Sequence, residues 1–132
     1  MRYTRTMSLL LLALAAAAQA QPPDWGTARE VEVRLSGFAF QPPQIELRPG
    51  EAVRLEIVND LLATRSFHAP RFFSAAQLPP ADRPKVRRGA IRLAPGERTA
   101  IRLVAPAPGR YSLRSGRLLQ AALGLRGEIV VR

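Results

Sequence analysis

The sequence predicts an all-β fold, a Greek-key β-sandwich of about seven strands with one or two short helical turns in its loops. Apolar and polar residues alternate in short runs, which is typical of strands with one buried and one wet face. Pro-Gly pairs stand just before several of these runs, where turns are expected. No window keeps a helical apolar period for three turns, so a helical domain is excluded.

Seven alternating runs define the expected strands in chain order. Pro49-Gly50, Pro95-Gly96 and Pro108-Gly109 each precede one of them. The runs are Val31–Leu35, Ile45–Leu47, Val53–Ile57, Ile91–Leu93, Ile101–Leu103, Tyr111–Leu113 and Glu128–Val131. The residues expected to face the core are Val31, Val33, Leu35, Val53, Leu55, Ile57, Ile101 and Leu103.

Three stretches do not alternate. Arg71–Leu78 and Leu118–Leu125 are apolar without a period of two, so each is expected to form one or two helical turns within a long loop. Pro79–Arg88 is rich in Pro and Arg and is expected to be a loop.

Residues 1–20 have the features of a secretory signal peptide. Arg2 and Arg5 precede an apolar stretch from Met7 to Ala18, and Ala18-Gln19-Ala20 is a small-residue cleavage site. The apolar stretch is shorter than the roughly 20 residues of a membrane span. An uncleaved anchor or a buried helix is the alternative. The sequence thus predicts a periplasmic or secreted protein without a transmembrane segment after cleavage, with a lead-in at 21–30 and one domain at 31–132.

Sulfur is absent from the expected mature chain. The sequence contains no Cys, its two Met residues (Met1 and Met7) lie in the leader, and His68 is its one histidine. This composition excludes disulfides, zinc fingers, iron–sulfur clusters, thiol catalysis and copper–thiolate centres. The carboxylates show no pairing in the sequence, and no Ser/His/Asp arrangement is signalled. We therefore expect a protein that is not an enzyme.

Segments at both ends of the domain resemble a known family. Phe38-Ala39-Phe40-Gln41-Pro42, with the strands and the Asn59 that follow, resembles the opening of small periplasmic cupredoxins. Ser66-Phe67-His68-Ala69-Pro70 resembles the first copper-histidine segment of cupredoxin-like domains of the iron-transport-associated type. The chain from Pro108 to Val131 resembles the family's last hairpin and ligand loop. The resemblance covers about residues 31–132 and implies a cupredoxin-like sandwich.

The resemblance also implies a ligand pattern, which this sequence does not keep. In such proteins the closing loop carries Cys, then His five residues on, then Met five further on. Those positions fall on Ser115, Gln120 and Leu125, so His68 is the only plausible copper ligand left. A blue-copper centre needs two imidazoles and a thiolate. No cofactor is expected, and copper is the alternative that the family suggests. His68, Ser115 and Gln120 either complete each other's hydrogen bonds in a relic pocket, or His68 is an ordinary loop histidine.

The strong positive charge is the remaining feature. The formal net charge is +10, or +8 without Arg2 and Arg5, and 19 of the 20 basic residues are Arg. Arginine suits bidentate contact with phosphate or carboxylate, although a solvated face is an equally good interpretation. Nucleic acid fits the charge but not the export signal. The candidates for binding an anion or a partner are Arg83, Lys85, Arg87, Arg88, Arg114 and Arg117.

These observations predict an exported, cupredoxin-fold binding or accessory protein that has lost its blue-copper site. A copper-binding electron-transfer or copper-handling protein is the first alternative. A basic module that binds an anionic membrane surface or an acidic protein partner is the second.

Overall fold

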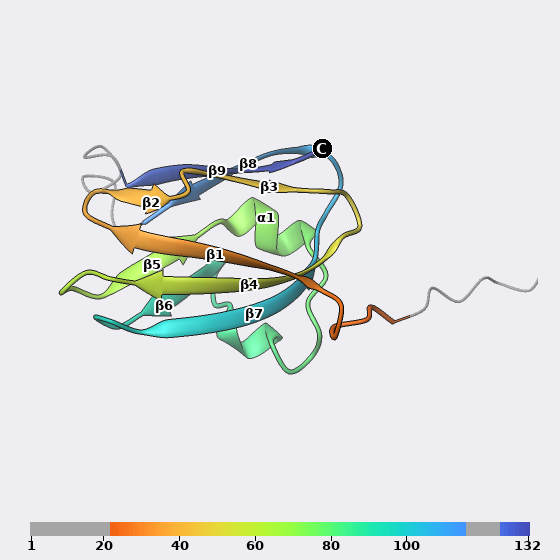
Figure 1. Ribbon diagram of the computed structural model, residues 1–132, viewed down its shortest axis with the longest axis horizontal. Helices are drawn as coiled ribbons and strands as arrows, with labels where there is room; N and C mark the ends of the chain where they lie inside the picture. Colours follow the sequence, from red (N-terminus) through yellow and green to blue (C-terminus); the bar gives the residue numbers. More distant parts are fainter. Residues whose placement is uncertain (1–21, 116–124) are drawn as a thin grey trace, which may run out of the picture.

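The computed structural model describes residues 22–115 and 125–132, which form two β-sheets in a sandwich (Figure 1). The predicted Greek-key β-sandwich is confirmed. The predicted leader at 1–20 and the stretch 118–124 of the second predicted helical segment lie outside the described residues. Within them, no helix is long and apolar enough to cross a membrane.

The first sheet has four strands in the order β2-β1-β4-β7. Its two central strands, β1 and β4, run parallel, with Val33 opposite Ile57 and Leu35 opposite Asn59. Strand β7 is antiparallel to β4 and places Ile101 opposite Leu55. The strands are β1 (Arg29–Ser36), β2 (Ala39–Gln41), β4 (Ala52–Asn59) and β7 (Arg98–Val104).

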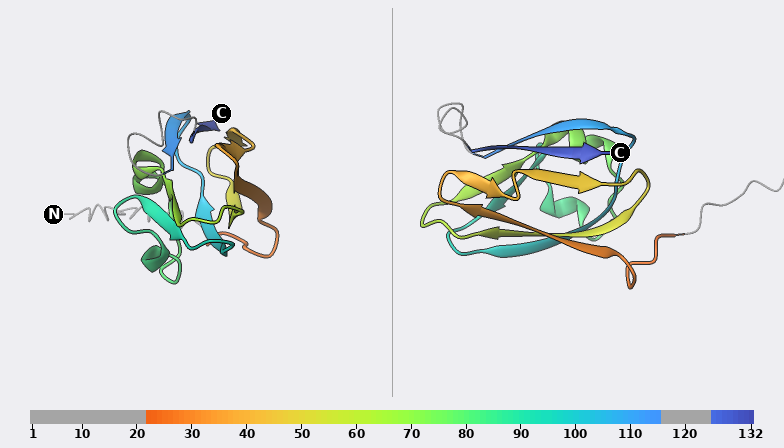
Figure 2. Two further views of the ribbon diagram at one scale, coloured as in Figure 1. Left: turned by 90° about the vertical axis from the view of Figure 1, so that its left-hand side faces the viewer. Right: turned by 45° about the horizontal axis from the view of Figure 1, so that its top comes forward.

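The second sheet has five strands in the order β3-β9-β8-β5-β6, so β6 lies at one edge beside β5. The short helix α1 (Pro70–Ala75) and the 3-10 turn η1 (Arg83–Lys85) lie on one side of the sandwich, away from β1 (Figure 2). The strands are β3 (Gln44–Leu47), β5 (Arg65–His68), β6 (Ala90–Leu93), β8 (Gly109–Arg114) and β9 (Arg126–Val131).

Two of these strands were not predicted. Strand β2 has three residues and β5 has four, and β5 has Phe67 as its single buried residue, so neither offers a full alternating run. The seven predicted strands are all present. Helix α1 overlaps the predicted helical stretch Arg71–Leu78 but begins one residue earlier, at Pro70. The predicted loop Pro79–Arg88 contains η1.

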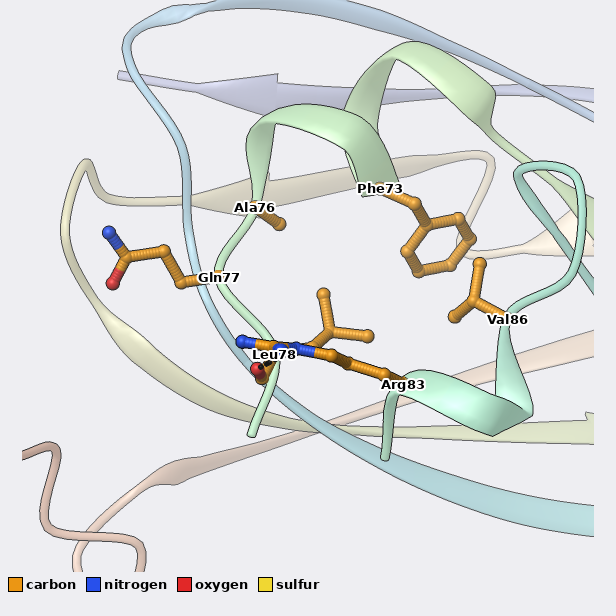
Figure 3. Close-up of a pocket in the computed structure, with 6 residues that line it drawn as sticks. All are labelled: Phe73, Ala76, Gln77, Leu78, Arg83 and Val86. Atoms are coloured by element: carbon orange, nitrogen blue, oxygen red, sulfur yellow. Dashed lines mark hydrogen bonds between the residues drawn. The ribbon is translucent and has the colours of Figure 1, made fainter. Parts of the chain in front are cut away.

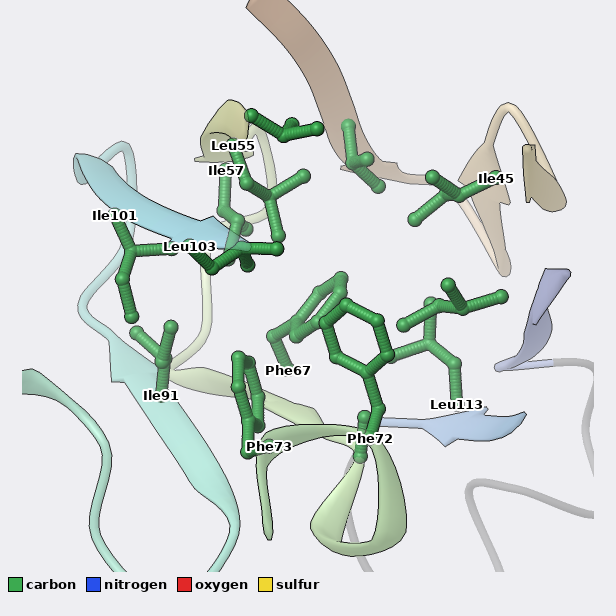
Figure 4. Close-up of a cluster of buried hydrophobic side chains, with 14 of the residues drawn as sticks. Ile45, Leu55, Ile57, Phe67, Phe72, Phe73, Ile91, Ile101, Leu103 and Leu113 are labelled. Atoms are coloured by element: carbon green, nitrogen blue, oxygen red, sulfur yellow. The ribbon is translucent and has the colours of Figure 1, made fainter. Parts of the chain in front are cut away.

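Apolar side chains from both sheets and from α1 fill the space between the layers (Figure 4). Phe67 lies 5.9 Å from Phe73 and 6.0 Å from Phe40, ring centre to ring centre, in tilted and edge-on arrangements that aromatic pairs favour. Of the eight predicted core residues, Val31 is only partly buried, because it lies near the start of β1. The other seven are buried as predicted: Val33, Leu35, Val53, Leu55, Ile57, Ile101 and Leu103.

Candidate functional site

Ser115 and Leu125 lie opposite each other at the two ends of the closing loop. The Ser115 N–H donates to the Leu125 carbonyl at 3.0 Å, which continues the β8–β9 ladder by one pair beyond Arg114 and Arg126. Both side chains are buried. Because side chains alternate along a strand, Ser115 shares the inner face of the sheet with the buried Leu113.

His68 emerges from the other face of the same sheet. It lies opposite Arg114, and residues directly opposite in a ladder share a face. Its neighbour Phe67 is fully buried on the inner face, so His68 points outward. The register therefore does not bring His68 and Ser115 together. Gln120, the third member of the predicted relic pocket, lies outside the described residues.

The residues at these positions do not fit a blue-copper centre. Ser115 offers a neutral hydroxyl, which has no hydrogen-bond partner among the described residues, and Leu125 offers no donor. The whole chain lacks Cys, so no thiolate is possible. In residues 22–115 and 125–132, no group of three His, Asp or Glu side chains is placed to hold a metal ion.

Many solved structures have a similar fold. A dithionite-reduced auracyanin from Roseiflexus castenholzii superposes with a TM-score of 0.58 at 19% identity, covering 80% of this chain and 98% of that one. Auracyanin B gives 0.55 at 22% identity, with 80% and 89% covered. Auracyanin A, a "blue" copper protein from Chloroflexus aurantiacus, gives 0.55 at 14% identity, with 78% and 98% covered. The fold is cupredoxin-like.

The likeness to auracyanins extends to the arrangement of the chain and not to its sequence. The sequence matches no known protein-family profile. It also matches no curated protein. The site of this cupredoxin-like protein must therefore be identified from its own residues.

An arginine-rich groove lies on the outer side of β5 and β6, and we call it the basic groove. Strand β5 contributes His68 and Ser66, β6 contributes Arg92, and the segment after η1 contributes Arg87 and Arg88. Its volume is about 910 Å³, and no carboxylate lines it. The complete lining is Thr64, Arg65, Ser66, His68, Pro84, Lys85, Arg87, Arg88, Ala90 and Arg92.

In the described part of the chain, the arginines of the basic groove are not paired with carboxylates. Among the described residues, Arg87, Arg88 and Arg92 form no ion pair and no side-chain hydrogen bond. Arg65 donates through Nη1 to the Thr64 carbonyl at 3.0 Å. Its Nε is buried without a partner in the described part of the chain. A buried donor of this kind is unusual and calls for an acceptor.

Asp82 fixes the loop that forms one wall of the groove. Its Oδ2 accepts from the Arg102 backbone N–H at 3.0 Å and from the Arg102 Nε at 2.9 Å, and its Oδ1 lies 3.1 Å from the Lys85 Nζ. Lys85 also donates to the Ala100 carbonyl at 2.8 Å. Burial raises the pKa of Asp82, but the hydrogen bonds from Arg102 and Lys85 outweigh it and hold the pKa below its ordinary value. The loop is thus attached to β7.

A tight turn at Arg88-Gly89 connects this loop to β6. Arg87 and Ala90 exchange both backbone hydrogen bonds, at 2.9 and 3.0 Å, so the turn has two central residues. Both have positive φ, 52° for Arg88 and 73° for Gly89, which is the geometry of a type I′ turn. Gly89 suits this turn, whereas Arg88 is the one non-glycine residue with positive φ in the described chain.

A second cavity of about 570 Å³ lies between α1 and η1 (Figure 3). Phe73 and Val86 point toward each other across it, and the Arg83 side chain extends toward Leu78. The Arg83 Nε donates to the Leu78 carbonyl at 3.3 Å. Arg83 is the one charged residue in its lining, which is otherwise apolar except for Gln77.

The structure separates the predicted basic candidates. Lys85, Arg87 and Arg88 line the basic groove, Arg83 lines the second cavity, and Arg114 is exposed opposite His68 without lining either. Arg117 lies outside the described residues. Arg65 and Arg92 also line the basic groove, but they were not among the candidates predicted from the sequence. The alternation of Ile91, Arg92 and Leu93 could have placed Arg92 on the outer face, but no pattern marks Arg65.

Proposed function

We propose that this chain is an exported binding protein that uses a cupredoxin-like fold without a blue-copper site. The observation that supports the proposal is the pair Ser115 and Leu125, which face each other at the closing loop and supply no soft donor. The His68 side chain points away from the outer face of the same sheet, opposite to the face that carries Ser115. A hydroxyl and an alkyl group do not replace the thiolate and second imidazole that such a centre requires.

Electron transfer has no support in the residues of this chain. It would need a redox centre, and the mature chain that we expect contains neither Cys nor Met. We also infer that the protein is not an enzyme. His68 forms no hydrogen bond with a serine or a carboxylate among the described residues, so the arrangement of a nucleophile and its base is not present there. Binding is the function that remains, and the predicted leader at 1–20 assigns it to the periplasm or the exterior.

A copper titration tests this proposal. Cu(II) is added to the purified metal-free protein, and the visible spectrum, the EPR spectrum and the bound copper are measured. We expect no intense visible band, because no thiolate exists to give sulfur-to-copper charge transfer, and no stoichiometric copper. His68→Gln is the control, because it removes the imidazole on the outer face and thus any weak surface binding. A coloured complex with one copper per chain would overturn the proposal.

A further inference from the structure

We infer that the basic groove binds an acidic segment of a partner protein, with its arginines paired to carboxylates of that segment. This inference deepens the proposed function, on which it rests only for the statement that the protein acts by binding. The groove is formed by two strands and a loop, and the loop is fixed by Asp82. Such a fixed wall holds its cations in place before a ligand arrives.

Positive charge is concentrated in the basic groove. Three arginines without a counter-ion among the described residues, Arg87, Arg88 and Arg92, line one groove without a carboxylate. Like charges gathered in this way repel one another and destabilise the folded chain. An anionic ligand would remove that repulsion.

The turn at Arg88-Gly89 is strained at Arg88. Arg88 has a φ of 52°, which asparagine or glycine adopts at lower cost than arginine. An unfavourable backbone conformation held by a well-ordered turn is a signal of function. Here it places a guanidinium on the lining of the basic groove, opposite the strands that carry Arg65 and Arg92.

The extent of the basic groove indicates the kind of ligand that fits it. The cations are distributed over three segments around about 910 Å³, which suits an extended chain with several charges better than a single phosphate. The same protein already pairs Arg29 with Glu51 through two parallel hydrogen bonds, at 2.7 and 3.2 Å.

A membrane surface fits less well. Exposed apolar side chains among the cations strengthen the binding of a protein to a bilayer. The large exposed apolar residues of the described chain, Phe38 and Leu62, do not line the groove. A concave lining also suits a protruding segment better than a flat surface.

A binding experiment with charge-matched variants tests the inference. The probe is fluorescein-labelled hexaglutamate, and its anisotropy is measured with the full chain at low and at physiological salt. The groove variant is Arg87→Gln with Arg92→Gln. The matched control is Arg34→Gln with Arg54→Gln, which removes the same charge from arginines that are already paired. We expect the groove variant to bind about tenfold more weakly and the control to bind about as well as the unchanged protein.

Two further measurements keep the result interpretable. Arg88→Asn retains the turn and relieves its strain, so weaker hexaglutamate binding by this variant cannot come from misfolding. Hexaglutamine, inorganic phosphate and phosphatidylglycerol vesicles are compared as ligands. Equal weakening by the groove and control variants, tighter groove-dependent binding of vesicles or phosphate, or no hexaglutamate binding at low salt would each overturn the inference. The copper titration is separate, so a coloured copper complex would overturn the proposed function alone.

Discussion

Arginine occurs in two different electrostatic settings in this protein. On the first sheet each exposed guanidinium has a carboxylate beside it: Arg54 lies opposite Glu30 in the β1–β4 ladder, and their side chains meet at 3.0 Å. In the basic groove, Arg92 lies opposite Ser66 in the β5–β6 ladder and has no counter-ion among the described residues. The number of arginines is similar in both regions, and the difference is that carboxylates lie within reach of those on the first sheet.

The distribution of carboxylates determines where the excess positive charge of this protein is concentrated. A formal net charge of +10 says only that cations are in excess. The first sheet neutralises its share through pairs such as Arg29–Glu51 and Arg98–Glu56. The excess is then left elsewhere, and much of it lines one groove. Exposed ion pairs contribute little to stability, so their main effect here is on where charge remains.

The largest expected effect on stability concerns Asp82, whose carboxylate contacts both Arg102 on the first sheet and Lys85 in the basic groove. Asp82→Ala should lower the free energy of unfolding by about 3 kcal/mol, because it leaves the Arg102 backbone N–H without its acceptor and frees the loop from β7. Glu30→Ala, which breaks an exposed pair, should lower it by less than about 1 kcal/mol. Urea unfolding measures both. Equal losses would mean that Asp82 is not the anchor of the groove wall.

Acid should weaken the ion pairs of Glu51 and Asp82, whereas the arginines of the basic groove should not contribute to this loss of stability. The hydrogen bond from Arg29 lowers the pKa of Glu51, and hydrogen bonds outweigh burial to lower the pKa of Asp82. A lowered pKa contributes stability above the ordinary pKa values of 4.5 and 3.8, and this stability is lost as the pH falls below them. The urea midpoint should therefore drop between pH 5 and pH 3. Asp82→Asn should reduce this drop in the urea midpoint, whereas Arg92→Gln should leave the drop unchanged. A urea midpoint that acid does not affect would contradict the ion pairs of Glu51 and Asp82.

The turn at Arg88 should show a conflict between stability and binding. Arg88→Asn should raise the free energy of unfolding by about 1 kcal/mol, because asparagine adopts positive φ more readily. The same change should weaken hexaglutamate binding. Arg87→Asn is the matched control, since Arg87 precedes the two residues of positive φ and should show no gain in stability. A loss of stability in Arg88→Asn would mean that the side chain, and not strain, dominates at this position.

The smallest expected effect is the change in stability when one arginine is neutralised, and it should have opposite signs in the two regions. Arg92→Gln should stabilise the protein by about 0.5 kcal/mol at low salt, because it relieves repulsion in the groove. Arg54→Gln should destabilise it by a similar amount, because Glu30 loses its partner. Both effects should shrink at high salt, as screening predicts. Thermal unfolding at two salt concentrations measures them, and equal signs would remove the distinction between the regions.

Sequence patterns predicted the fold well where burial is periodic. The run Val53–Ile57 is confirmed in β4 because alternation is a direct consequence of one buried face. Strand β5 escaped prediction because Phe67 is its only buried residue, and its place is determined by pairing with β6 and β8.

The candidate site was predicted only in part. Arg87 and Arg88 stand out in the sequence as a basic run, yet the same run includes Arg83, which lines the other cavity. Arg65 could not be identified, since its role depends on a ladder that brings distant segments together. The placement of His68 relative to Ser115 likewise depends on the register of β5 and β8, which spacing along the chain does not determine.

The most direct test of the contrast between the two regions is an NMR titration that follows the side-chain Nε–Hε signals of the arginines while hexaglutamate is added. The signals of Arg87, Arg88 and Arg92 should shift, because among the described residues these side chains have no carboxylate partner and are free to donate to one. Those of Arg29 and Arg34 should stay in place, because their carboxylate partners are already bound at 2.7 and 2.6 Å. Shifts spread evenly over both groups, or confined to the arginines of the first sheet, would contradict the account.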